Sequence, residues 1–76
     1  MKKNLLKAAI TKNEIPIAKL SNEVGICESA LRRKIRGDVQ FSLSEAGRMS
    51  EVLKLDDAEI LTIFFDREVS YKKQNS

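Results

Sequence analysis

The stretch PIAKLSNEVGICESALRRKIRG, residues 16–37, decides the fold of this chain. It contains two short patterns of apolar residues at helical spacing, joined by a tight turn at Gly25. Pro16 suits the first position of the earlier helix, where its missing N–H has no helical partner. The later pattern covers residues 28–36 and closes at Gly37, as helices commonly do. Its basic side chains are Arg32, Arg33, Lys34 and Arg36.

Three further helices are predicted around this stretch, so the expected fold class is all-α with five helices. The first covers about residues 2–12, and Asn13 is its expected terminator, since Asn tolerates the left-handed conformation. The fourth and fifth each begin with a capping box, in which Ser or Asp precedes Glu by three residues. These boxes start at Ser42 and Asp56, and the fourth helix is expected to run to about Lys54.

The predicted core consists of the apolar side chains that share one face of each helix. In the loop after the third helix, Val39 and Phe41 are expected to alternate inward. Ser21 and Ser50 also fall on core faces, where each hydroxyl can bond a carbonyl one turn back. The inward apolar positions are Leu5, Leu6, Ala9, Ile10, Ile17, Leu20, Val24, Ile26, Ala30, Leu31, Ile35, Leu43, Ala46, Met49, Leu53, Ala58, Ile60, Leu61, Phe64 and Phe65.

Charge is distributed unevenly along the 76 residues. Residues 1–37 carry nine basic groups against three acids, whereas residues 38–76 carry five basic groups against eight acids. A basic half directs one end of a molecule toward a polyanion, although Lys and Arg also simply solubilise helix surfaces. Two helices at a fixed angle, the second basic on its outer face, suit the major groove of DNA.

Cysteine and histidine content argues against catalysis and metal binding. Cys27 is the one cysteine and there is no histidine, so an internal disulfide, a zinc site and the commonest general base all lack their residues. Cys27 stands at the expected N-cap of the third helix and is interpreted as a small buried thiol. The start of the chain has too short an apolar stretch for a signal peptide, and we expect a cytoplasmic protein.

The chain resembles the Cro/repressor-type helix-turn-helix proteins of phages and bacteria, the lambda repressor-like family. The resemblance spans about residues 5–65. The matching elements are Leu20, Ser21, the Val24-Gly25-Ile26 turn, Leu31, Ile35, Gly37, the run Phe41-Ser42-Leu43-Ser44-Glu45-Ala46, and the cluster Glu59-Ile60-Leu61-Thr62-Ile63-Phe64-Phe65. It implies one domain over residues 1–68 with a polar tail at 69–76.

The resemblance also implies a function, namely a transcription regulator of a bacterial host cell, from a phage or prophage. It would bind a two-fold duplex DNA operator as a homodimer, through the third helix. No enzymatic activity, cofactor, metal, small-molecule ligand or membrane is expected. The runner-up is a protein-binding adaptor, such as an anti-repressor or antitoxin component, which docks through the last helix and the acidic half.

Candidate contact residues follow from the outward positions of the third helix and from nearby lysines. Expected base contacts are Glu28, Ser29, Arg32 and Arg33. Expected phosphate contacts are Lys12, Lys19, Lys34 and Arg36. Several have an alternative role: Glu28 stabilises the helix dipole, Arg33 pairs with an acid or a phosphate, Arg32 contacts the DNA backbone, and the Lys34 and Arg36 side chains are only solvated. The wide apolar surface of the last helix suggests a dimer face at Ile60, Ile63 and Phe64.

Overall fold

The computed structural model describes residues 1–66, and this part of the chain forms five helices and no strand. The helices are α1 (Lys3–Asn13), α2 (Ile17–Val24), α3 (Glu28–Arg36), α4 (Leu43–Val52) and α5 (Asp57–Phe65). The predicted all-α class is therefore confirmed. The predicted end of the domain at residue 68 and the polar tail at 69–76 lie outside the described residues. No helix formed by residues 1–66 is long and apolar enough to cross a membrane.

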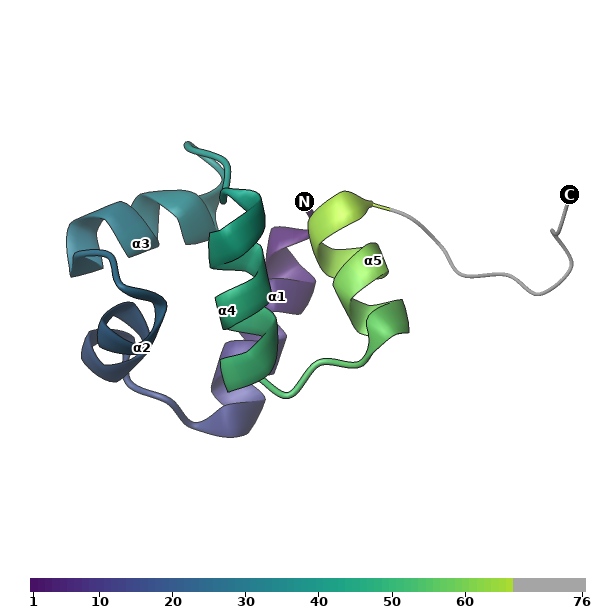
Figure 1. The fold of residues 1–76 in the computed structure, drawn as a ribbon, viewed down its shortest axis with the longest axis horizontal. Coiled ribbons are helices and arrows are strands. Elements are labelled where there is room, and N and C mark those ends of the chain that lie inside the picture. The colour runs from purple at the N-terminus through teal and green to yellow at the C-terminus, as the bar shows by residue number, and fades with distance from the viewer. Residues whose placement is uncertain (67–76) are drawn as a thin grey trace, which may run out of the picture.

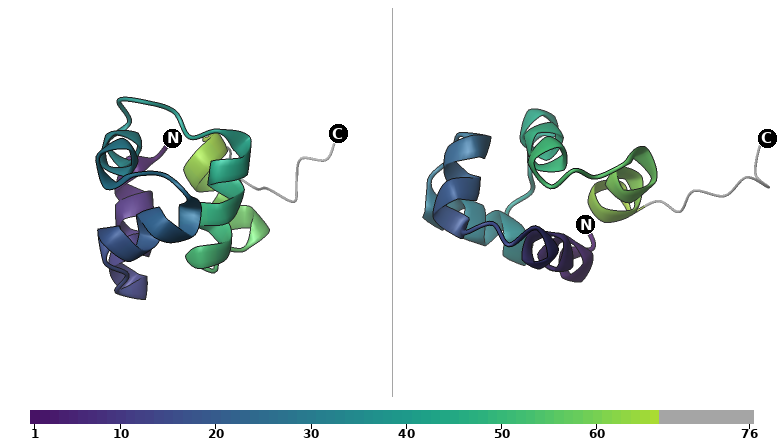
Figure 2. Two further views of the ribbon diagram at one scale, coloured as in Figure 1. Left: turned by 60° about the vertical axis from the view of Figure 1, so that its left-hand side comes forward. Right: turned by 90° about the horizontal axis from the view of Figure 1, so that it is seen from below.

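The helices are arranged with α2 and α3 at one end of the molecule and α5 at the other (Figure 1). α1 and α4 lie between these ends, as the view from below also shows (Figure 2). α2 packs against α3 and α4, and α1 packs against α3 and α5. One side of α3 therefore remains at the edge of the molecule.

A single apolar cluster joins all five helices. Its buried members are Leu6, Leu20, Val24, Leu31, Ile35, Met49, Leu53 and Ile63. Burying a side chain of this size is worth about 1.5–3 kcal/mol, so each of these residues contributes substantially to the stability of the fold. The two core hydroxyls behave as predicted: Ser21 Oγ donates to the Ala18 carbonyl at 2.9 Å, and Ser50 Oγ donates to the Ala46 carbonyl at 2.7 Å.

The helix starts agree closely with the sequence. The capping boxes at Ser42 and Asp56 are both present, with side chain and backbone bonding each other reciprocally. Pro16 differs by one position from the expectation. Its backbone is extended, with φ −64° and ψ 147°, so it is the N-cap of α2 and not its first helical residue.

The helix ends show where the sequence prediction was wrong by a residue or two. Asn13 is still helical, and its side-chain amide donates to the Ala9 carbonyl at 2.8 Å and to the Leu53 carbonyl at 3.2 Å. The left-handed residue that ends α1 is Glu14. α4 ends at Val52, before the expected Lys54.

Five residues at or just after the ends of helices have a positive φ. Glycine occupies two of these positions, Gly25 at φ 87° and Gly37 at φ 91°, and these two close α2 and α3. The other three are Glu14, Lys54 and Asp66, with φ values of 54°, 57° and 55°. A side chain in this conformation is held there at a cost, because Cβ crowds the following carbonyl.

Several apolar side chains expected in the core are exposed. Leu43 is 75% exposed because it begins α4 and lies at the open end of that helix, beyond the buried Ala46 and Met49. Leu5 and Val39 are also exposed, so the inward assignment was wrong for all three, whereas Phe41 packs on the core as predicted. Leu61 and Phe65 are likewise exposed on α5.

Candidate nucleic-acid interface

The outward face of α3 carries the residues that the sequence singled out. Its members are Glu28, Ser29, Arg32, Arg33 and Arg36, and all five are exposed. Their spacing of one, four, five and eight residues from the first member places them on one side of a helix. Leu31 and Ile35 lie on the opposite side and are buried in the core, which fixes the helix orientation.

The three arginines of this face differ in their partners. Arg32 Nη2 is 3.7 Å from Glu28 Oε1, one turn back. Arg36 donates from Nε at 3.1 Å and from Nη2 at 2.8 Å to Asp38 Oδ2. Arg33 makes no side-chain hydrogen bond or ion pair with any other residue of the described range. Because exposed pairs of this kind are worth only about 0–1 kcal/mol, the paired guanidinium groups can exchange partners at little cost.

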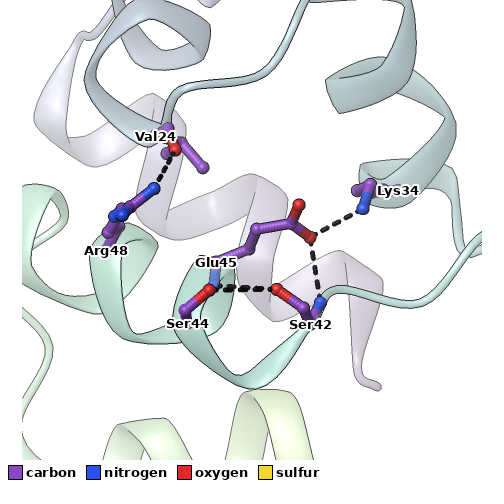
Figure 3. Close-up of polar contacts among 6 residues, drawn as sticks. All are labelled: Val24, Lys34, Ser42, Ser44, Glu45 and Arg48. Atoms are coloured by element: carbon purple, nitrogen blue, oxygen red, sulfur yellow. Dashed lines mark hydrogen bonds and ion pairs between the residues drawn. The ribbon is translucent and has the colours of Figure 1, made fainter.

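Lys34 lies on the flank of α3, apart from the outward face. Its Nζ is 2.6 Å from Glu45 Oε1, and the two side chains are only 15% and 17% exposed. Figure 3 shows Glu45 reaching from α4 toward both Lys34 and the Ser42 backbone. The hydrogen bond from Lys34, followed by the one from the Ser42 N–H, lowers the pKa of Glu45. The structure therefore engages Lys34 within the protein, although the sequence suggested a phosphate contact.

Arg48 provides a second polar link from α4. Its Nη1 donates to the Val24 carbonyl at 3.1 Å, at the end of α2 (Figure 3). A Cβ added to Gly25 would lie 3.4 Å from the same nitrogen, so the guanidinium covers the turn between α2 and α3. The backbone N–H groups of Gly25 and Ile26 bond the Ser21 carbonyl at 2.8 and 3.1 Å, which closes the turn.

The remaining predicted phosphate contacts lie on other helices. Lys19 is exposed on α2, the helix that packs against α3. Lys12 is exposed near the end of α1, where it lines a groove between α1 and α5 together with Ala58 and Thr62. The structure therefore does not bring Lys12 to the outward face of α3. Lys3, which the sequence did not suggest, lies nearer, with Nζ 3.5 Å from the Arg36 carbonyl.

Cys27 is exposed at the N-cap of α3, so its interpretation as a buried thiol was wrong. Cys27 precedes the first turn of the helix, and its exposed Sγ is 3.5 Å from Ser29 Oγ. The hydrogen bond with the Ser29 hydroxyl lowers the pKa of the Cys27 thiol.

The proposed dimer face on α5 divides into buried and exposed residues. Ile63 is 5% exposed and belongs to the core, so it does not contribute to a surface. Phe64 packs on the core, with its ring 5.6 Å from that of Phe41 in an edge-to-face contact, and Ile60 is half-buried. Ile63 and Phe64 of α5 thus pack inside the protein and Ile60 is partly covered. Fewer apolar residues of this helix are exposed than its composition suggests.

A different apolar surface is exposed instead. The structure has six exposed large apolar residues within 1–66, and four of them line one hollow of about 400 Å³ near the start of α4. We call these four the Leu43 patch: Met1, Val39, Leu43 and Phe65. Gly37, the residue that ends α3, lines the same hollow, so the patch borders the C-terminal end of α3.

Sequence reasoning missed Arg48, Asn13 and Lys3 as contacts between helices. One signal was present for Arg48, because it follows Glu45 by three residues and therefore lies on the same side of α4. Among residues 1–66, no three Cys, His, Asp or Glu side chains come together in a way that could hold a metal ion.

Comparisons with protein-family models, with curated proteins and with solved structures each give no match for this chain. The likeness to a known family therefore rests on the residue pattern alone.

Proposed function

We propose that this chain is a sequence-specific duplex DNA-binding protein of the helix-turn-helix class, with α2 and α3 as the paired helices. The observation that carries the proposal is the outward face of α3, which presents three arginines on one side of a helix with a buried opposite side. A helix of this kind fits the major groove, where Arg bonds guanine O6 and N7 and Ser bonds several bases.

The proposed assignment keeps base contacts for Arg33, Ser29, Arg32 and Glu28, and phosphate contacts for Arg36 and Lys19. Arg33 is the leading base contact because its guanidinium has no partner within the described residues. We assign Lys34 to bracing α3 from within, since Glu45 holds its ammonium. A transcription regulator of Cro or repressor type is the biological role that this arrangement suits.

The salt dependence of DNA binding tests the proposal. Affinity for duplex DNA should fall linearly with salt on logarithmic axes, with a slope of about −0.9 for each phosphate contacted. Filter binding or fluorescence anisotropy over 50–300 mM salt measures it, and selection from random duplexes should return a palindromic consensus. An affinity that does not change with salt, or no binding at low salt, would contradict the proposed DNA binding.

We also propose that the protein binds as a homodimer through the Leu43 patch. Apart from the amino group of Met1, no charged group lines the hollow, so two copies can meet there with little like-charge repulsion. The patch borders the end of α3. In the proposed dimer the two-fold axis runs through the patch with both α3 helices facing the same side, as binding to two half-sites about 34 Å apart requires.

A protein-binding adaptor is the second candidate, and the same patch favours it. Four exposed apolar side chains around one hollow are typical of a contact surface for another protein. Under this reading the Leu43→Glu variant loses a heterologous partner while the wild-type protein shows no affinity for DNA at low salt. Under the first reading the same variant loses self-association and operator affinity together.

A further inference from the structure

α4 contacts the α2–α3 pair at two polar points that bracket α3. The first is the Arg48 bond to the Val24 carbonyl, at the turn before α3 begins. The second is the Lys34–Glu45 ion pair, in the last turn of α3. Within residues 1–66 these are the hydrogen bonds and ion pairs that connect side chains of α4 with α2 and α3.

We propose that Glu45 and Arg48 are positioning residues that fix the orientation of α3 relative to α2, and thereby determine how the outward face of α3 meets a duplex. This inference rests on the proposed DNA-binding function. Neither residue lies on α3, and neither contacts DNA in the proposal; both act through the groups they hold.

Arg48 supplies a hydrogen-bond donor to a backbone carbonyl group at the end of α2. The last carbonyls of a helix have no partner inside the helix, and the turn at Gly25 bonds only the Ser21 carbonyl. The Arg48 guanidinium bonds the Val24 carbonyl and covers Gly25. It therefore fixes the exit of the chain from α2, which sets the direction in which α3 starts.

Glu45 joins α3 to the start of α4 through one oxygen atom. Its Oε1 accepts the Ser42 N–H at 2.9 Å and the Lys34 ammonium at 2.6 Å. The capping box already restricts the Glu45 side chain, because the Glu45 N–H bonds Ser42 Oγ at 3.1 Å. Lys34 is thus held by a carboxylate whose position is fixed, and its low exposure limits competition from water and salt.

The test uses two substitutions that leave the outward face of α3 intact. Glu45→Gln keeps the capping box, since Gln serves at that position, but removes the charge that attracts Lys34. Arg48→Met keeps the side-chain stem and removes the donor. Two further variants serve as controls. Lys54→Met removes one positive charge just after α4, away from α3, and Asp56→Ala removes the capping box of α5. These two variants control for charge and for general destabilisation.

Two readouts are measured on each variant. Residual dipolar couplings of backbone N–H groups in the unliganded protein report the orientation of α3 relative to α2. The ratio of affinities for a selected operator and a random duplex, at one salt concentration, reports how well α3 is aligned. We expect Glu45→Gln and Arg48→Met to change the α3 couplings and to lower the affinity ratio by about fivefold or more, as one mismatched base pair does. The two controls should keep both values.

The outcomes separate the inference from the function on which it rests. Unchanged α3 couplings in both variants would overturn the positioning role, whatever the DNA results. Changed couplings with an unchanged affinity ratio would overturn the link between orientation and specificity. If the wild-type protein binds no duplex, the proposed function falls, while the couplings still decide whether Glu45 and Arg48 orient α3.

Discussion

Arg33 differs from Arg32 and Arg36 in having no partner among residues 1–66, although all three are exposed on the same face of α3. Its free guanidinium can bond a guanine without first breaking an ion pair. We expect Arg33→Ala to cost about 1–3 kcal/mol on the preferred operator and to relax specificity at one base position. Arg36→Ala should instead weaken all sequences alike. Equal losses for Arg33→Ala on operator and random duplexes would contradict its assignment as a base contact.

Leu31 is fully buried on the opposite side of the same helix. Its truncation removes core contacts and leaves a cavity, so Leu31→Ala should lower the free energy of unfolding by about 2–5 kcal/mol. Leu61→Ala truncates an exposed leucine of α5 and should change stability by no more than about 0.5 kcal/mol. Urea unfolding followed by circular dichroism measures both. Similar losses for the two variants would mean that Leu31 is not the core residue described.

Single side chains were predicted well where their environment is set by the local helix. Leu31 and Ile35 are core residues of α3, and the outward positions of that helix are exposed, as the period of 3.6 residues requires. Cys27, Val39 and Leu43 were assigned wrongly, and they lie at a helix end or in a loop. Leu5 and Leu61 lie within α1 and α5 and are exposed as well. In all these cases exposure depends on which neighbouring helix covers the residue.

Whole helices were predictable because capping residues and glycines mark their limits locally. The bounds of α3 and the starts of α4 and α5 agree with the sequence prediction. The left-handed Glu14 ends α1, and the left-handed Lys54 lies two residues after α4; the sequence carries no local signal for either conformation. Asn13 was expected to end α1. Its side-chain amide instead donates a hydrogen bond to the Leu53 carbonyl, just after the end of α4.

The junction of α3 with α4 should respond to pH. Hydrogen bonds from Lys34 and Ser42 lower the pKa of Glu45 in the folded protein. Its stabilising contribution is therefore present above the unfolded-state pKa of about 4.3, and is lost as the pH falls through the lower folded-state value. The difference in unfolding free energy between wild type and Glu45→Gln should be largest near pH 7 and shrink below about pH 4.3.

Denaturant unfolding at several pH values between 7 and 2.5 measures this difference. Glu51→Gln is the matched control, because Glu51 is an exposed carboxylate of α4 that makes no ion pair within the described residues. A wild-type to Glu45→Gln difference that stays constant with pH would show that the carboxylate does not stabilise the junction.

Dimer formation depends on the surface of the whole protein. Leu43 is the most exposed large apolar side chain of the described range and lines a hollow whose lining residues have no charged side chain. Leu43→Glu should convert a dimer to a monomer, since two copies would bury opposed carboxylates. Sedimentation equilibrium at micromolar concentration measures the change, with Leu5→Glu as the control. A wild-type protein that stays monomeric on operator DNA would argue against the dimer.

The candidate site was predictable only in part, for a reason that concerns the whole molecule. The outward residues of α3 follow from one helix, whereas the Lys34–Glu45 and Arg48–Val24 contacts join residues 11 and 24 positions apart. Such contacts depend on the angles between helices, which no local pattern encodes. The sequence therefore predicted the exposed face of α3 but not the contacts with α4 that hold this helix.

The three left-handed residues that are not glycine mark places where the chain retains avoidable strain. Glu14 directly follows α1 and Lys54 lies two residues after α4, and both are away from the outward face of α3. Glycine at either position would relieve about 1 kcal/mol of backbone crowding, partly offset by the greater freedom it gives the unfolded chain. Resistance to heat can therefore be raised at these two positions without substituting any residue on the outward face of α3.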